Sequence, residues 1–395
     1  MTQHTPPAYI DTPDALRQLG DSLKGRPWVA LDTEFMREKT YYPKFCLLQV
    51  ATPDFSACVD PLALTDLEPL TEWLFDPAIV KVVHSGRQDM EIFYHLFGRL
   101  PAPLFDTQIA APLLGLAEQI GYAGLIQHLL GVNLAKTHAR TDWSRRPLAP
   151  EQLRYAADDV IYLASAYENL VKGIEGLGRT AWLEDDFAEL SNPALYENPP
   201  ELAWQRIGGA QQLKGKGLNV LQALAAWREE TARAEDVPRG WIVKDEVLLD
   251  LARQQPRNAE ALSLTRGLDD KIVRRHGRTL CAVIAEALEK PKLSLELPPR
   301  PAKKSAEQEA VLDALGAVVR LRAAQNTLNP VILASRKDLE HLVDGEADAR
   351  LLHGWRRKMV GDELLGLLRG ELGLVIEQGT LRVTAHDSPR TAAAD

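Results

Sequence analysis

Four carboxylates and one tyrosine, in three short segments, carry the strongest chemical signal in this chain of 395 residues. They are Asp32 and Glu34 in WVALDTEF, Asp89 in VVHSGRQDMEIF, and Tyr155 with Asp159 in LRYAADDVIYL. Each segment places an acid in or beside an apolar run, and an unpaired carboxylate is costly to bury. Four converging acids without matching bases would repel one another, so the pattern predicts a site for divalent cations.

The elements expected around these residues bring the acids together. Residues 28–35 form a buried strand, on which alternation points Asp32 and Glu34 the same way. KVVHSG predicts a strand and a turn, and RQDMEIFYHLF a helix with Asp89 on its apolar face. Tyr155 and Asp159 are four residues apart on a helix and are therefore neighbours, whereas Asp158 points away from that face.

The three segments resemble the exonuclease motifs of the DEDD superfamily in its tyrosine-containing branch. The resemblance rests on LDTEF, HSGRQD and YAADD, extends through TYYPKFCLLQVA and LFDTQIAAPLL, and is closest to the ribonuclease D family. It implies an α/β ribonuclease H-like domain with a mixed sheet and flanking helices. It also implies that Asp32, Glu34, Asp89 and Asp159 are metal ligands and that Tyr155 positions the attacking water.

The expected cofactors are two divalent metal ions, Mg²⁺ or Mn²⁺, because the donors are all oxygens. Two such ions support in-line hydrolysis of a phosphodiester, with release of a nucleoside 5′-monophosphate from the 3′ end. A tyrosine pKa of about 10 is too high for an efficient general base at neutral pH. Tyr155 is therefore expected to orient the water rather than deprotonate it.

Weaker signals in the first half suggest contacts to RNA. Phe35 and Tyr42 are candidates for stacking on terminal bases, with core packing as the alternative, and His84 is either a substrate contact or a turn histidine. Four basic residues before the third motif could bind phosphates or simply face solvent: Lys136, Arg140, Arg145 and Arg146. Asp106 with Thr107 is expected to cap a helix.

The net charge of −9 is unevenly divided along the chain. Residues 1–198 carry 16 Lys and Arg against 27 Asp and Glu, and residues 199–395 carry 30 against 28. The acidity therefore lies in the half that contains the motif acids. The second half is the better candidate for holding a nucleic-acid backbone, with moderate and salt-sensitive affinity.

Beyond Leu202 the sequence shows only helical periodicity, and a Pro-rich stretch near 290–304 marks a linker. VLQALAAWREETARAEDVPRGWIVKDEVLLDLA has a fainter counterpart about 90 residues later, in VLDALGAVVRLRAAQNTLNPVILASRKDLEHLV. Both segments resemble HRDC domains, the first closely. The predicted organisation is an exonuclease domain at 1–198, HRDC at 199–292, a linker at 293–304, a divergent HRDC-like domain at 305–380 and a flexible tail at 381–395.

These two all-α modules also offer candidate RNA contacts. The basic residues that stand out are Lys214, Lys216, Arg274, Arg275 and Arg278, with a second cluster at Arg356, Arg357 and Lys358. Each of them could equally belong to a solvated face. Trp241, after Pro-Arg-Gly, is expected in the core rather than as a stacking platform.

The resemblance implies a 3′–5′ exoribonuclease that trims tRNA precursors and other small structured RNAs with a free 3′ end. Two alternatives stay open: a DNA 3′–5′ exonuclease of repair or proofreading, and a non-catalytic RNA-binding scaffold on a nuclease fold. A helicase accessory is disfavoured because GxxxxGK[ST] is absent from the sequence.

Composition narrows the setting in which the chain acts. No run reaches the ~20 apolar residues of a membrane span, and MTQHTPPAYI does not resemble a signal peptide. Three cysteines without metal-type spacing favour a reducing cytoplasm. No heptad seam is present, so we expect a monomer.

Overall fold

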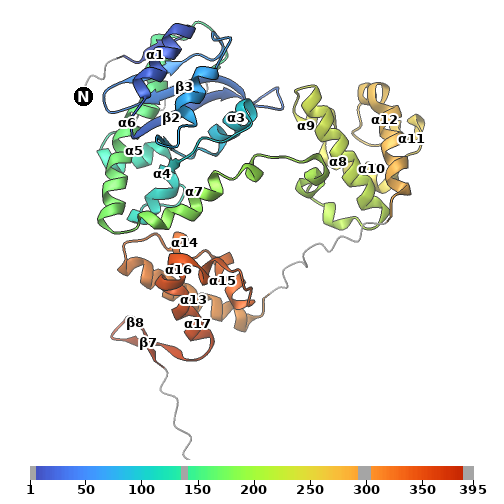
Figure 1. The fold of residues 1–395 in the computed structure, drawn as a ribbon. Coiled ribbons are helices and arrows are strands. Elements are labelled where there is room, and N and C mark those ends of the chain that lie inside the picture. The colour runs from blue at the N-terminus through green and yellow to red at the C-terminus, as the bar shows by residue number, and fades with distance from the viewer. Residues whose placement is uncertain (1–5, 135–140, 292–303, 386–395) are drawn as a thin grey trace, which may run out of the picture.

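The computed structural model describes residues 6–134, 141–291 and 304–385. The first part folds as an α/β domain, here called the catalytic domain, and two helical modules follow it (Figure 1). The first helical module comprises residues 200–291 and the second comprises residues 304–385. None of the helices in these ranges has both the length and the apolar character that a membrane span requires.

The catalytic domain is built on a six-stranded mixed sheet with the order β1-β4-β3-β2-β5-β6. Its central strand β2 pairs antiparallel with β3 and parallel with β5. The strands are β1 (Ala8–Ile10), β2 (Trp28–Met36), β3 (Lys44–Ala51), β4 (Ser56–Val59), β5 (Val80–Val83) and β6 (Leu104–Asp106). The expected mixed sheet is therefore confirmed.

Helices cover both faces of this sheet. They are α1 (Pro13–Leu23), α2 (Glu68–Leu74), α3 (Arg87–Phe97), α4 (Thr107–Ala110), α5 (Tyr122–Leu130), α6 (Pro150–Gly176) and α7 (Glu184–Leu190), with short 3₁₀ turns η1 (Ala111–Leu114), η2 (Thr180–Leu183) and η3 (Pro193–Leu195). Val29 and Leu31 of β2 pack with Met90 and Phe93 of α3. Ala30 packs instead in the cluster that contains residues of α6. The alternation expected along β2 thus separates two layers.

A buried ion pair fixes the segment before α6 to the sheet. All five N–H groups of Arg146 are used within the protein: two go to the carboxylate of Asp60, at 2.6 and 2.7 Å, and three go to backbone carbonyls. Asp60 is 1% exposed in its side chain and also accepts from Tyr9. The expectation that Arg146 contacts RNA is therefore not supported, since each of its N–H groups already has an acceptor within the protein.

Replacing Asp60 by alanine should destabilise the catalytic domain by about 3–5 kcal/mol, because it leaves the guanidinium of Arg146 buried without its counter-charge. Urea unfolding at neutral pH measures this. The matched control is Asp54→Ala, which breaks an exposed pair with Arg26 and should cost about 1 kcal/mol or less. Equal losses in the two variants would contradict the structural role of the buried pair.

The two helical modules repeat one arrangement, in which a long helix, a one-turn helix and a third helix follow one another. In the first module these are α8 (Lys216–Ala234), α9 (Arg239–Ile242) and α10 (Asp245–Gln254), preceded by the 3₁₀ turns η4 (Pro200–Arg206) and η5 (Ala210–Gln212) and followed by α11 (Ala259–Ser263) and α12 (Asp270–Glu289). In the second they are α13 (Ala306–Gln325), α14 (Pro330–Leu333) and α15 (Arg336–Val343). The internal repeat predicted from the sequence is therefore present in the structure.

The end of the second module differs from the prediction. After η6 (Arg350–Leu352), α16 (Gly354–Arg356), the π-helical turn η7 (Arg357–Gly361) and α17 (Asp362–Leu368), the chain forms a hairpin of β7 (Leu372–Glu377) and β8 (Thr380–Ala385). A wholly helical module with a tail from residue 381 was therefore wrong. Strands this short alternate weakly, and β7 lies mostly on the surface, so periodicity gave little warning.

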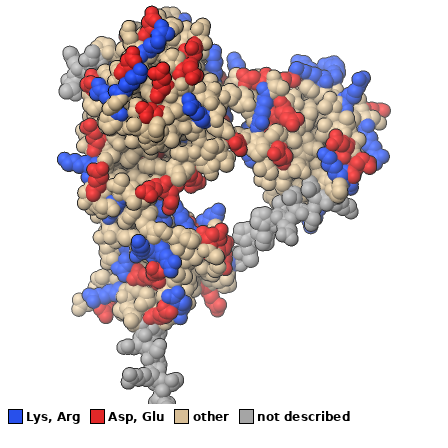
Figure 2. Space-filling model, viewed as in Figure 1, with Lys and Arg blue, Asp and Glu red and all other residues tan. Residues whose placement is uncertain are grey.

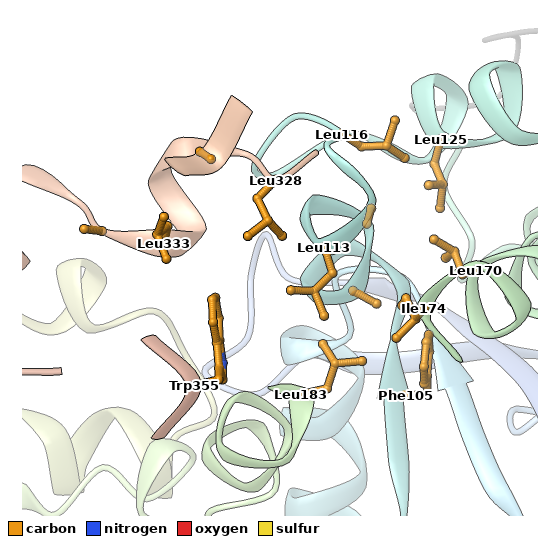
Figure 3. Packing of buried hydrophobic residues seen from close by; sticks show 14 of the residues in the cluster. Phe105, Leu113, Leu116, Leu125, Leu170, Ile174, Leu183, Leu328, Leu333 and Trp355 are labelled. Atoms are coloured by element: carbon orange, nitrogen blue, oxygen red, sulfur yellow. The ribbon is translucent and has the colours of Figure 1, made fainter. Parts of the chain in front are cut away.

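A continuous apolar cluster joins the second module to the catalytic domain. Leu113 and Leu183 of the catalytic domain face Leu328, Leu333 and Trp355 of the module (Figure 3). The ring of Trp355 stacks on Trp182 with centroids 4.3 Å apart and planes 4° apart. The module is therefore docked by core-like packing.

The first module is joined to the catalytic domain by polar contacts of Tyr41 with residues of the module, here called the latch. Tyr41, in the loop between β2 and β3, donates its hydroxyl to the fully buried carboxylate of Glu229 in α8. Arg233 and Arg239 each donate to the Tyr41 hydroxyl at 3.1 Å. Asp236 accepts from the Tyr41 backbone N–H at 3.0 Å. The loop that follows the first motif is thereby tied to the module.

Acid should weaken this latch. Burial opposes ionisation of Glu229, but hydrogen bonds from Arg239 and Tyr41 outweigh it and hold its pKa below 4.5. A carboxylate with a depressed pKa stabilises the folded state fully above its unfolded value and loses that contribution as pH falls through the folded value. We therefore expect Glu229→Gln to cost about 3 kcal/mol at pH 7 and clearly less below pH 4.

Urea unfolding of the parent protein and of Glu229→Gln at pH 7 and at about pH 3 tests the pH dependence of the Glu229 contribution. Glu230→Gln, at the exposed neighbouring position, is the control and should have little effect at either pH. A cost for Glu229→Gln that does not change with pH would show that the ionised carboxylate is not what stabilises the joint.

Candidate active site

The site lies at the C-terminal ends of the parallel strands β2 and β5, where each strand leads into a loop. Asp32 and Glu34 are alternate residues of β2 on the side covered by α6, which carries Tyr155 and Asp159. Asp89 lies in the first turn of α3, on the other side of the sheet. The three predicted segments therefore meet around the end of one strand.

The turn before α3 is shaped by its residues. Ser85 has a φ of +60°, and a Cβ on Gly86 would lie 2.4 Å from Val83, so glycine is needed there. Asp106 holds this turn by accepting from the backbone N–H groups of Ser85 at 3.0 Å and Gly86 at 2.8 Å. The turn sets the direction of α3, and with it the position of Asp89.

Asp106 also caps α4, as predicted, because it accepts from the backbone N–H of Gln108 at 2.8 Å. Its bonds to the turn before α3 were not predicted, since they join segments 20 residues apart. Thr33 is a second residue that sequence reasoning missed. Its hydroxyl donates to Asp89, from the face of β2 opposite Asp32 and Glu34.

The motif acids raise one another's pKa. Burial, followed by the charges of Asp32, Asp159 and Asp89, raises the pKa of Glu34 to about 9. Burial and then the charge of Asp32 raise the pKa of Asp159 to about 8, and burial raises that of Asp32 to about 6. Burial, then Asp32, places the pKa of Asp89 well above its ordinary value. The four carboxyl groups thus share one region of low polarity.

No Lys or Arg of the described chain is among the strongest influences on these four pKa values. Such a site favours a bound cation, and its oxygen donors suit hard divalent ions. Within the described residues, no three acid, His or Cys side chains already form a coordination shell. The residues therefore fit a metal by the chemistry of their donors.

Tyr155 lies beside the acids, one turn before Asp159 on α6. Burial raises its pKa above 10, and the charges of Asp159, Glu34 and Asp32 add to this effect. Its ring stacks on Trp143, with centroids 6.5 Å apart and planes 22° apart. The phenol therefore keeps its proton at neutral pH and can act as a hydrogen-bond donor.

Tyr122 is a further residue near the acids that no sequence signal indicated. Burial raises its pKa well above 10, and Asp159 and Asp32 are the next strongest influences. Its hydroxyl donates to the backbone carbonyl of Asp158 at 2.9 Å, which fixes α5 against α6. The two residues are 36 positions apart, so no local pattern could have revealed this contact.

The remaining predicted contacts have varied surroundings. His84 Nδ1 lies 2.9 Å from the Thr107 hydroxyl, and Phe35 packs against the core on the α3 side. Arg145 is exposed and pairs with Asp142 at 3.1 Å. Lys136 and Arg140 lie outside the described residues. The proposed RNA contacts of His84, Phe35 and Arg145 stay predictions.

Among the basic candidates of the modules, two are committed to the fold. Lys216 donates to the carbonyls of Leu288 and Lys290 at the end of α12, and Arg356 is 4% exposed beside Asp186. Their use as RNA contacts is therefore not supported. Those on the surface are Lys214, Arg274, Arg275, Arg278, Arg357 and Lys358. Of these, Arg275 pairs with Glu235 at 2.9 Å.

Surface charge does not single out one binding region on the side of the molecule seen in Figure 2. On the face seen in Figure 2, basic and acidic side chains are interspersed over all three parts of the molecule. Trp241 is 59% exposed, contrary to the expectation that it belongs to the core. It lies on the one-turn helix α9, where the preceding Pro-Arg-Gly gives no helical periodicity from which a face could be assigned.

Comparison with known proteins agrees with this geometry. A 3′–5′ exonuclease family model matches residues 7–175, and an HRDC domain model matches residues 217–284. Ribonuclease D of Granulibacter bethesdensis is 40% identical over 375 residues, covering 94% of this chain and 95% of that protein. Ribonuclease D of Sphingobium indicum is also 40% identical, covering 93% and 96%.

Solved structures point the same way. The crystal structure of Escherichia coli RNase D, an exoribonuclease involved in structured RNA processing, superposes with a TM-score of 0.79 at 33% identity. The match covers 92% of this chain and 99% of the Escherichia coli chain. The catalytic core of RRP6 from Trypanosoma brucei gives a TM-score of 0.58 at 25% identity, covering 73% and 81%. This chain therefore belongs to the ribonuclease D family of 3′–5′ exoribonucleases.

Proposed function

We propose that this enzyme trims 3′ extensions from tRNA precursors and other small structured RNAs, releasing nucleoside 5′-monophosphates. The observation that carries the chemistry is the cluster of four carboxylates, with Asp89 buried and the other three half-buried, which has no basic side chain among its strongest electrostatic influences and has Tyr155 beside it. The substrate class follows from the two modules docked on the catalytic domain, which offer surfaces for a folded RNA body. RNase D of Escherichia coli acts on structured RNA.

Asp32, Glu34, Asp89 and Asp159 are proposed to hold two divalent cations, Mg²⁺ or Mn²⁺. When bound there, the ions would activate a water and stabilise the leaving 3′ oxygen. Thr33 fixes the carboxyl group of Asp89 through its hydroxyl, and Asp106 fixes the turn from which α3 starts. Tyr155, protonated at neutral pH, orients the attacking water by a hydrogen bond.

The reaction is proposed to take place on a free RNA 3′ end, with the enzyme acting as a monomer in the cytoplasm. The site must admit a chain terminus, so a 3′-phosphorylated or recessed end should be a poor substrate. All three cysteines are free thiols, which suits a reducing compartment.

The test uses a tRNA with a short 3′ extension, labelled at its 5′ end and resolved on a sequencing gel. With Mg²⁺ or Mn²⁺ we expect a ladder that shortens from the 3′ end, and with EDTA we expect intact RNA. A DNA strand of identical sequence is the control for sugar specificity. Intact RNA under every metal condition would overturn the proposal, and faster loss of DNA would reassign the substrate.

A further inference from the structure

A cleft of about 390 Å³ lies at the seam between the catalytic domain and the first helical module. Residues from the loop after β2, from α3, from the segment before η4 and from α8 and α9 line it. Its aromatic members are Tyr41, Tyr42, Tyr94, His95 and Tyr196.

The rings of this cleft, here called the seam cleft, differ in exposure: Tyr41 and Tyr196 are buried in the core, whereas Tyr42 and His95 form an accessible stacked pair. Tyr42 stacks on His95, with centroids 3.6 Å apart and planes 12° apart, and Tyr41 meets Tyr42 edge-on at 4.7 Å. His95 is exposed and Tyr42 is only half-buried. Burial lowers the pKa of His95, so the stacked pair is uncharged at neutral pH.

The charged residues of the seam cleft largely neutralise one another. Arg37 forms a two-pronged pair with Glu91, in which Nη1 donates at 2.7 Å and Nη2 at 2.5 Å. Arg239 is engaged by the carboxylate of Glu229, and Arg233 donates to the backbone of Asn198. A cleft that is rich in rings and poor in free charge suits a nucleobase better than a phosphate.

The short chain segments between the motif acids and the seam cleft limit how far apart the two can lie, and therefore which nucleotide could reach the cleft. Arg37 follows Glu34 by three residues, about 10 Å of extended chain. His95 follows Asp89 by six residues of helix, about 9 Å. A strand of stacked nucleotides rises about 3.4 Å for each residue, so about 10 Å corresponds to two or three nucleotides.

We propose that the seam cleft binds an unpaired base of the RNA substrate, two to three nucleotides before its 3′ terminus, on the platform formed by Tyr42 and His95. This inference rests on the proposed function of the motif acids and names a binding site for the same RNA strand. Because Tyr41 ties the loop to Glu229 of the module, docking of the module completes the cleft. An RNA of at least three or four nucleotides would place a base in the seam cleft, whereas a dinucleotide is too short to do so.

A binding experiment without turnover tests this placement. Single-stranded RNA of six nucleotides carries 2-aminopurine at one position at a time, counted from the 3′ end, and is titrated with full-length Asp159→Asn protein in Mg²⁺. Stacking on an aromatic ring quenches the fluorophore. We expect the strongest quench at the third or fourth nucleotide. Adding Tyr42→Leu or His95→Ala should remove that quench and leave the terminal position unchanged.

Affinity gives a second readout. Stacking of one base contributes enough that its loss should raise the Kd of the hexanucleotide about 5- to 100-fold. In the active enzyme, Tyr42→Leu should raise KM for the hexanucleotide more than it raises KM for a dinucleotide. His341→Ala, a histidine of the second module, is the matched control and should alter neither quantity. Thermal melting verifies that each variant is folded.

The possible results separate the two proposals. A quench profile identical in Tyr42→Leu, His95→Ala and His341→Ala would overturn the seam cleft as a base site and assign its rings to packing between domains. A uniform loss of quenching at every position would also overturn it, because it would indicate a general defect in RNA binding. If the unsubstituted enzyme releases no nucleotide with either metal, it is the proposed function that fails.

Discussion

Asp159→Asn is expected to reduce turnover by about 10³-fold or more while RNA affinity changes no more than a few-fold. The substitution preserves the size of the side chain and replaces one of the four motif carboxylates by a neutral amide. The contacts proposed for the RNA backbone and bases involve other residues, so they should persist. Single-turnover hydrolysis of a labelled RNA and a filter-binding titration in Mg²⁺ measure the two quantities.

The same variant should be more stable than the parent protein in EDTA. Burial and the charge of Asp32 raise the pKa of Asp159 to about 8, which shows that its ionised form is disfavoured in the fold. Removing this acid should therefore increase the free energy of unfolding by about 1–3 kcal/mol. Mg²⁺ should raise the melting temperature of the parent more than that of the variant.

Asp158→Asn is the matched control, since it changes the neighbouring acid on the same helix. Its turnover should stay within about threefold of the parent, because Asp158 lies off the face that carries Tyr155 and Asp159. Equal losses of turnover and of RNA binding in Asp159→Asn, accompanied by a lower melting temperature, would instead identify Asp159 as a structural residue.

The motif segments were predictable because each is local. The helix over 87–97 was predicted at the bounds observed for α3, and the strand over 28–35 differs from β2 by one residue. Periodicity of two along the strand and of 3.6 along the helices assigns faces without knowledge of the fold. It therefore placed Asp32 with Glu34, and Tyr155 with Asp159, on common faces.

Contacts between distant segments were not predictable in this way. Arg146 looked like one member of an exposed basic run. Its partner Asp60, however, lies 86 residues earlier, directly after β4. Arg356 likewise owes its burial to Asp186. A charge run shows that cations are close in sequence, but only the fold shows which of them meet a buried acid.

The contacts that dock the two modules also join segments far apart in the sequence, so they were not predictable either. Tyr41 occurs in a polar loop, and nothing in that loop indicates that its hydroxyl meets a buried glutamate 188 residues later. The proposed trimming of structured RNA would depend on these contacts, since they set where each module stands relative to the motif acids. The strength of the joints is therefore open to direct measurement.

Trp182→Ala is expected to undock the second module. Trp182 stacks on Trp355, and Arg179, lying over the Trp182 ring at 5.3 Å, donates to the carbonyl of Leu113 at 2.6 Å and to that of Asn326. Loss of the indole should weaken the joint by about 3 kcal/mol. The module should then melt in a separate transition, and small-angle scattering should show a larger radius of gyration.

Undocking should affect substrates unequally. A hexanucleotide needs only the motif acids and the adjoining cleft, so its hydrolysis should stay within about twofold of the parent. A tRNA with a 3′ extension should be trimmed about tenfold more slowly, the loss expected from removing about 1.4 kcal/mol of binding. Trp241→Ala, at an exposed tryptophan of the first module, is the control and should leave scattering unchanged. Unchanged scattering in Trp182→Ala itself would show that the remaining contacts, including the 2.7 Å pair of Arg350 with Asp186, hold the module without the stacked indoles.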